Sequence, residues 1–302
     1  RIPMIPLSKI KRIVTSVMGK GISDIVPLKK GMTNDSYIFR HGDSRYVLRL
    51  NGVGTEKLIN RKQESDTYRA IAGLSLSDTV IAIDEKQGYK ITKFIENART
   101  CNPMNTEDVS LCMEKLRAFH EKNIHTSYTF DLYRMLDYYQ SLWIRKKSMY
   151  ADYDEVKNRI YNWKPWIEKV NKEHWTLTHM DAVPDNFMIT DKQEVVLIDW
   201  EYAGMQDKHF DLAMFAIYAG YTLEESERLM HIYFKGECSS ELYIRILAYH
   251  AIGGLLWSNW CEFKEDMGIH FGEYAQKQYE YAKEYSLLVD TLLQELKTGG
   301  KL

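Results

Sequence analysis

Short strand-like runs of apolar residues, separated by turn residues, dominate the first third of the chain. These runs are expected at residues 25–28, 36–39, 46–50, 79–83 and 89–94. Helical spacing of apolar residues precedes them at residues 7–18, and a charged helix is expected at residues 55–72. Residues 1–95 are therefore predicted to form a mostly antiparallel sheet with one inserted helix.

From residue 106 onward the apolar residues recur mainly at helical spacing. Helices are expected around residues 109–119 and at residues 132–150, 155–170, 210–218, 223–234, 241–263 and 274–296. Short strands are expected between them at residues 175–178, 187–189 and 195–198. Thr222 and Glu225 form a capping-box pair before one of these helices. The pattern predicts an α+β fold with a small sheet-rich lobe at residues 1–95 and a large, mostly helical lobe at residues 96–302.

Composition excludes several classes of protein. The 302 residues are 45% hydrophobic and carry a net charge of −2, which leaves no basic footprint for nucleic acid. No apolar run is long enough for membrane insertion, and no signal peptide is visible. The four cysteines lack metal-ligand spacing, and free thiols of this kind are typical of a reducing, cytoplasmic location. Nothing in the sequence predicts the oligomeric state.

The strongest chemical signal lies at residues 178–202. Asp181 follows His179 by two residues and precedes Asn186 by five, and Asp199 ends an apolar strand. In kinase-like folds this spacing holds a catalytic base and two Mg²⁺ ligands. In this catalytic loop we expect Asp181 to accept or orient the acceptor proton and His179 to brace the backbone, while Asn186 and Asp199 bind metal. The alternative is a polar loop between two core strands.

If residues 178–202 transfer phosphate, the first lobe should bind the nucleotide. Gly31, Thr33 and Asn34 lie in a small polar turn between two strands, where backbone N–H groups can approach phosphate closely. Arg49 occupies a strand position at which a kinase places its phosphate-binding lysine, and Glu64 on the next helix is its expected ion-pair partner. The alternatives are an ordinary turn and an exposed ion pair.

Several segments together resemble one family. Besides residues 178–202, these segments are residues 31–34, 54–61, 210–213, 256–260 and 271–274. They resemble the choline/ethanolamine kinase and aminoglycoside phosphotransferase superfamily, and within it the bacterial LicA-type choline kinases, over residues 28–281. The resemblance implies a bilobal protein-kinase-like fold, with ATP and Mg²⁺ as cofactors. It also implies transfer of the γ-phosphate to the hydroxyl of choline or a similar small amino alcohol.

The resemblance also implies roles for individual residues. Asp181 matches the catalytic aspartate of the family, and Asn186 and Asp199 match its metal ligands. Arg49 takes the place of the strand lysine, as it does in choline kinases. The segment Lys93, Phe94 and Ile95 matches the hinge beside the adenine.

An aromatic acceptor pocket is expected in the second lobe. Trp257 and Trp260 lie three residues apart on a predicted helix and share a face. Tyr274 begins the next helix, and Tyr202 follows the metal-binding segment. A quaternary ammonium group cannot donate ordinary hydrogen bonds, so aromatic faces are its natural partners. The alternative is that both tryptophans belong to the core.

One departure from the family concerns charge. Animal-type choline kinases place an acidic residue in the helix after the segment that matches Asp211, where it helps to hold the ammonium group. Residues 214–218 contain no acid. We therefore expect the balancing charge elsewhere, with Asp181, Glu201 and Asp207 as candidates, and we include Glu201 among the substrate-binding residues.

Three other functions compete with choline kinase. Ethanolamine is also attracted to aromatic side chains, so an ethanolamine kinase stays an alternative. An aminoglycoside phosphotransferase would need many carboxylates for several ammonium groups, which fits a tryptophan pair less well. The alternative outside the enzymes is an inactive kinase-like binding domain. The presence of Asp181, Asn186 and Asp199 together argues against it, because an inactive chain would be free to lose any of them.

Overall fold

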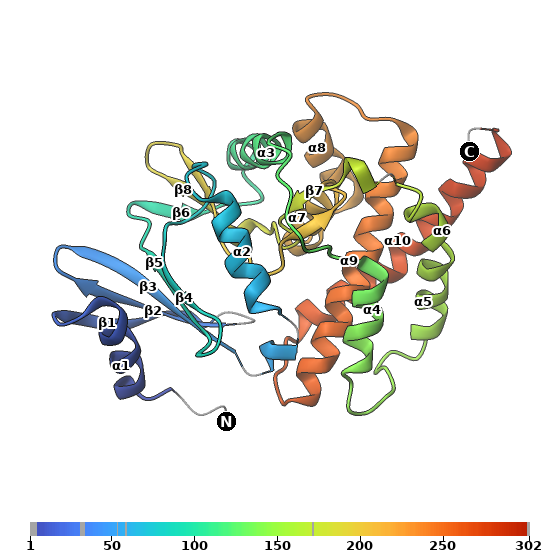
Figure 1. Ribbon diagram of the computed structural model, residues 1–302. Coiled ribbons are helices and arrows are strands. Elements are labelled where there is room, and N and C mark those ends of the chain that lie inside the picture. Colours follow the sequence, from blue (N-terminus) through green and yellow to red (C-terminus); the bar gives the residue numbers. More distant parts are fainter. Residues whose placement is uncertain (1–4, 31–33, 53, 58, 171, 301–302) are drawn as a thin grey trace.

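The N-terminal part of the chain folds into a five-stranded antiparallel sheet, at the blue and cyan end of Figure 1. The computed structural model describes residues 5–300, apart from residues 31–33, 53, 58 and 171. In spatial order the strands are β1 (Ile22–Lys30), β2 (Asn34–His41), β3 (Ser44–Asn51), β5 (Tyr89–Lys93) and β4 (Val80–Asp84).

Two helices accompany this sheet, α1 (Leu7–Met18) and α2 (Arg61–Ile71). Helix α1 buries Ile10 and Val14 in a small core with Leu48 and Ile91 from the central strands. Because side chains alternate across a strand, Arg49 and Lys90 project from the opposite face of the sheet. These two residues are paired in register between β3 and β5.

The rest of the chain is mainly helical (Figure 1). Its helices are α3 (Thr106–Glu121), α4 (Leu132–Ser141), α5 (Tyr153–Asn162), α6 (Lys164–Ile167), α7 (Phe210–Ala219), α8 (Leu223–Phe234), α9 (Ser240–Asp266) and α10 (Glu273–Thr298). Two small antiparallel sheets lie among them, β6 (Ala98–Thr100) with β8 (Phe187–Thr190) and β9 (Val195–Leu197), and β7 (Thr176–Thr178) with β10 (Gly204–Gln206). No helix among the described residues combines the length and apolar character needed to cross a membrane.

The predicted fold class is confirmed, and so is the capping box of Thr222 and Glu225 at the start of α8. The division of the chain at residue 95 stays a prediction. Some predicted bounds were wrong. The helix expected at residues 55–72 begins only at Arg61, because Asn60 accepts the free N–H groups of its first turn, and Thr55–Lys57 is a separate 3-10 turn.

Two other predicted helices were too long. The helix expected at residues 132–150 ends at Ser141, and the one expected at residues 155–170 is divided into α5 and α6. Pro165 lies in the first turn of α6, where the missing N–H costs nothing, but it cannot continue a preceding helix. Strands β6 and β10 were missed because Ala98–Thr100 and Gly204–Gln206 contain few of the β-branched and aromatic residues that favour strands.

Helix α9 is the central element of the helical part and is buried along most of its length. It packs against α10 (orange and red in Figure 1) with a very close approach at Gly254. A Cβ atom at Gly254 would lie 2.6 Å from the Gln278 carbonyl oxygen and 2.9 Å from the Ala282 nitrogen. Only a residue without a side chain allows these two backbones to approach so closely.

We therefore expect Gly254→Ala to destabilise the protein although alanine favours helix. Overpacking against backbone should lower the free energy of unfolding by about 1–3 kcal/mol, measured by urea unfolding. Gly253→Ala is the matched control. Its added Cβ atom meets the side chains of Ile217 and Met214 at 3.1 and 3.3 Å, which can move more easily. Equal effects of the two substitutions would contradict the close-approach argument.

Candidate active site

A cleft of about 490 Å³ is lined both by the sheet face that carries Arg49 and by the segment around Asp181. Most predicted site residues line this cleft: Asn34, Arg49, Lys93, Phe94, Ile95, Asp181, Asn186, Asp199, Glu201, Tyr202, Trp257, Trp260 and Tyr274. Glu64 and His179 are buried and are not lining residues. Gly31 and Thr33 lie outside the described residues.

The catalytic loop is held by a buried carboxylate at the start of α7. The N–H groups of His179 and Met180 donate to the two oxygens of Asp211 at 3.1 and 2.8 Å. The Nε2 atom of His120 lies 2.8 Å from the same carboxylate. Met180 has a φ of 68°, a left-handed conformation that costs free energy in a non-glycine residue. The bend at Met180 leads directly into Asp181.

The two expected metal ligands are joined through backbone. The N–H of Ile198 donates to the carbonyl oxygen of Asn186 at 2.9 Å, and Asp199 follows with a φ of 60°. The Nε2 atom of His179 lies 2.8 Å from the Ile198 carbonyl oxygen. This position agrees with a bracing role for His179, since its ring holds the strand end that carries Asp199.

The environment of Asp181 makes its carboxylate unusually basic. Burial raises the pKa of Asp181 well above its ordinary value, and the nearby carboxylates of Glu201 and Asp199 raise it further. The Asn186 amide donates to the Asp181 carbonyl oxygen at 2.8 Å and lies 3.3 Å from its Oδ2 atom. A carboxylate in this environment accepts a proton more readily than an exposed aspartate does.

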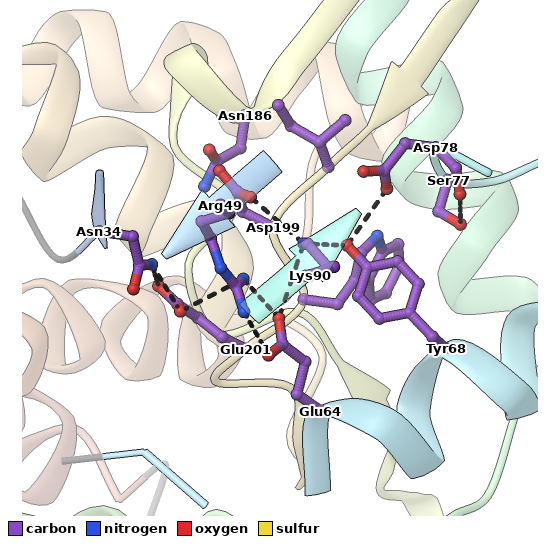
Figure 2. Close-up of polar contacts among 12 residues, drawn as sticks. Asn34, Arg49, Glu64, Tyr68, Ser77, Asp78, Lys90, Asn186, Asp199 and Glu201 are labelled. Carbon is purple, nitrogen blue, oxygen red and sulfur yellow. Dashed lines mark hydrogen bonds and ion pairs between the residues drawn. The ribbon is translucent and has the colours of Figure 1, made fainter. Parts of the chain in front are cut away.

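The predicted ion pair of Arg49 and Glu64 is confirmed, and it is buried rather than exposed (Figure 2). The guanidinium donates to both carboxylate oxygens at 2.6 and 2.7 Å. Burial alone would raise the pKa of Glu64, but Arg49, Lys90 and Arg61 outweigh it and lower that pKa below its ordinary value. The nucleotide-binding role of the pair stays a prediction.

Lys90 is the main residue that sequence reasoning missed. Figure 2 shows its ammonium group between several partners, with Nζ 2.9 Å from the Tyr68 hydroxyl, 3.6 Å from Glu64 Oε2 and 3.7 Å from Asp199 Oδ1. It also lines the cleft. Its strand position between the core residues Tyr89 and Ile91 was the available signal, because that alternation places a lysine on the face opposite α1.

Glu201 has a different setting from the one expected. Its two oxygens accept from the Asn34 amide at 3.2 and 2.9 Å, and Arg61 donates to one of them at 2.9 Å. A second Arg61 nitrogen donates to the Asn34 side-chain oxygen at 3.2 Å. The carboxylate thus ties the segment after Asp199 to the first lobe (Figure 2), and its acceptor-binding role stays a prediction.

Asp207 does not line the cleft, so its candidacy as a charge for the acceptor was wrong. Its carboxylate binds the His209 ring at 2.8 Å and the Tyr249 hydroxyl at 2.6 Å. A nitrogen of the Arg245 guanidinium also lies 3.7 Å from Asp207 Oδ2. These contacts direct the Asp207 carboxylate toward the interior of the helical part.

The aromatic side chains expected around the acceptor all line the cleft. The rings of Tyr202 and Trp257 meet edge to face with centroids 5.0 Å apart, and those of Trp257 and Trp260 at 5.8 Å. Tyr218, which was not predicted, lies 5.8 Å from Tyr274 and also lines the cleft. The tryptophans are therefore both core residues and part of the cleft surface.

A family model described as choline/ethanolamine kinase matches residues 25–232. The chain belongs to the choline/ethanolamine kinase family. It is accordingly an ATP-dependent kinase that binds a nucleotide and acts on a small amino alcohol.

Individual relatives agree with this family membership. The chain is 29% identical over 266 residues to protein LicA of Haemophilus influenzae strain Rd, covering 83% of this chain and 97% of that protein. It is similar to the crystal structure of choline kinase LicA from Streptococcus pneumoniae, with a TM-score of 0.81 at 26% identity, covering 93% of this chain and 98% of that chain. A crystal structure of LicA in complex with AMP has a TM-score of 0.79 at 25% identity, with coverage of 93% and 98%.

The buried ion pair leads to a stability prediction. Glu64→Gln removes the charge that neutralises Arg49 and should lower the free energy of unfolding by about 3–5 kcal/mol, measured by urea unfolding. The control is Glu121→Gln, which breaks an exposed pair with Arg117 on α3 and should change stability by about 0.5 kcal/mol or less. A loss for Glu64→Gln as small as the control would show that the pair is not needed for folding.

Proposed function

We propose that this chain transfers the γ-phosphate of ATP to the hydroxyl of choline, giving phosphocholine. The observation that carries this proposal is the meeting of Asp181 with the aromatic wall of Tyr202, Trp257, Trp260 and Tyr274 in one cleft. A methylated ammonium group is held by aromatic faces at about 0.5–2 kcal/mol per contact. The choline kinase activity named for the Streptococcus pneumoniae relative supports the same acceptor.

The nucleotide is expected at the sheet side of the cleft. Lys93, Phe94 and Ile95 line it there, at the C-terminal end of β5, and are proposed to face the adenine. Arg49 and Lys90 are paired in register and place two positive charges on the cleft face of the sheet, with Lys90 Nζ 3.7 Å from Asp199 Oδ1. Fixed cations at this position suit the phosphates of the donor.

Asn186 and Asp199 fit the needs of Mg²⁺. This ion prefers oxygen ligands and usually keeps several waters, so one or two carboxylates with substrate phosphates are enough to hold it. The Asp199 side chain is 41% exposed and faces the cleft, where a carboxylate can meet an ion. When bound, Mg²⁺ would neutralise charge on the phosphate groups.

The residues of the chain then have separate tasks. The aromatic wall holds the ammonium end of choline, and the carboxylate of Asp181 accepts the hydroxyl proton as the oxygen attacks the γ-phosphorus. The new bond joins that oxygen to phosphorus, and the bond between phosphorus and the β–γ bridging oxygen breaks. ADP leaves with the electron pair of that bond. The rest of the cleft positions the two reactants in line.

The direct test measures ADP release with choline, ethanolamine and a set of aminoglycosides as acceptors. We expect the highest kcat/KM with choline. Asp181→Asn should lower kcat by about 10²–10⁴-fold, since it removes the base, while ATP affinity measured by calorimetry changes little. Higher kcat/KM with ethanolamine or an aminoglycoside would replace the proposed acceptor, and near-wild-type turnover of Asp181→Asn would contradict the base assignment.

The aromatic wall is tested separately. Trp257→Ala should raise the KM for choline by about tenfold while leaving the KM for ATP nearly unchanged, because a single aromatic face contributes up to about 2 kcal/mol. Trp257→Phe keeps an aromatic face and serves as the control, with a smaller rise. If both substrates lose affinity equally in Trp257→Ala, the residue acts only through packing.

A further inference from the structure

The aromatic wall supplies faces for an ammonium group, but a full positive charge is also attracted to a carboxylate. The helix segment at residues 214–218, which borders the cleft through Tyr218, contains no acidic residue. Its last residue, Tyr218, lines the cleft and donates a hydrogen bond from its hydroxyl to Asp185 Oδ2 at 2.7 Å. Asp185 lines the same cleft.

The backbone fixes where the Asp185 carboxylate lies. Pro184–Asn186 form a 3-10 turn inside the catalytic loop, and the N–H of Asn186 donates to the Val183 carbonyl oxygen at 2.9 Å. Asp185, four residues after the proposed base Asp181, is thus held in a hydrogen-bonded turn. Tyr218 reaches it from the end of α7, so a turn and a helix hold the carboxylate jointly.

Tyr218 also connects this carboxylate to the aromatic wall. Its ring meets that of Tyr274 at 5.8 Å between centroids, inclined by 61°. Burial and then the Asp185 carboxylate raise the pKa of Tyr218, so the hydroxyl keeps its proton and remains a donor. The residue that holds the Asp185 carboxylate therefore also packs against Tyr274, a member of the aromatic wall.

The other acidic residues that the structure places in the cleft differ from Asp185 in position, because Asp199, Glu201 and Asp78 contact side chains of residues 1–95. Asp199 lies beside Lys90 and is an expected metal ligand, and Glu201 binds Asn34 and Arg61. Asp78 accepts from Tyr68, whose hydroxyl in turn receives a hydrogen bond from Lys90 at the donor side. Asp181 is the proposed base.

We propose that Asp185, held by Tyr218, is the carboxylate that balances the positive charge of the ammonium group of the acceptor. The inference rests on the proposed function, because it assigns a specificity residue to the acceptor end of the same cleft. A charge–charge attraction of this kind needs no hydrogen bond, so it suits a fully methylated ammonium. It also distinguishes choline from an alcohol of the same shape without charge.

That difference provides the experiment. The acceptors are choline and 3,3-dimethylbutan-1-ol, a neutral alcohol in which carbon replaces the ammonium nitrogen. Asp185→Asn should lower kcat/KM for choline by about tenfold to hundredfold and change kcat/KM for the neutral alcohol by less than about threefold. If the neutral alcohol is not turned over, its inhibition constant against ATP-dependent choline phosphorylation is measured instead and should stay unchanged.

Tyr218→Phe removes only the hydroxyl. It should also lower kcat/KM for choline more than for the neutral alcohol, but by a smaller factor than Asp185→Asn does. The matched control is Tyr221→Phe, whose hydroxyl binds the Pro103 carbonyl and which does not line the cleft. It should leave the preference for choline over the neutral alcohol unchanged.

The outcomes separate the two levels of the proposal. Equal losses for both alcohols in Asp185→Asn would overturn the inference, because a disturbed loop or metal ligand affects every acceptor. Unchanged choline kinetics would overturn it as well. A wild-type enzyme that does not phosphorylate choline would instead contradict the proposed function itself.

Discussion

The geometry of the active site depends on one buried carboxylate, that of Asp211. It accepts the backbone N–H groups of His179 and Met180 and lies against the His120 ring, so both of its oxygens are used. Asp211 lies in the first turn of α7, where the helix dipole favours negative charge. These contacts offset the cost of the left-handed Met180, and the resulting bend directs Asp181 into the cleft.

Charged and aromatic side chains are distributed unevenly along the cleft, and in the proposed reaction this would separate donor from acceptor. The sheet side carries Arg49 and Lys90, whose charges are shared with Glu64 and Asp199. The side formed by α9 and its neighbours is aromatic, and its tryptophans are nearly inaccessible. In the proposed reaction, the phosphates of the donor would meet Arg49 and Lys90 at one end, and the ammonium group of the acceptor would meet aromatic rings at the other. Asp181 lines the cleft with both sets of residues.

The sequence predicted the fold class and most members of the cleft, because periodicity and the spacing within residues 178–202 are local signals. Tyr218 could not be found in this way, since it reaches the cleft through helix packing. The strand alternation around Lys90 was a local signal for its face of the sheet, but only its pairing with Arg49 between β3 and β5 brings it to the cleft. Asp207 shows the converse. It is close in sequence to Asp199, yet Tyr249 and His209 hold it elsewhere. Helix bounds failed where capping by Asn60 and the position of Pro165 outweighed apolar spacing.

The same limit explains why the charge for the acceptor seemed to be missing. The sequence shows that residues 214–218 contain no acid. A carboxylate that balances the ammonium group, however, only has to be near that group in space. Tyr218 extends from that segment and donates a hydrogen bond to an aspartate of the catalytic loop. The carboxylate therefore does not have to belong to the helix itself. Such an arrangement would place the charge on the loop that also carries the base. The binding of the ammonium group and the orientation of the choline hydroxyl toward Asp181 would then both depend on the turn Pro184–Asn186.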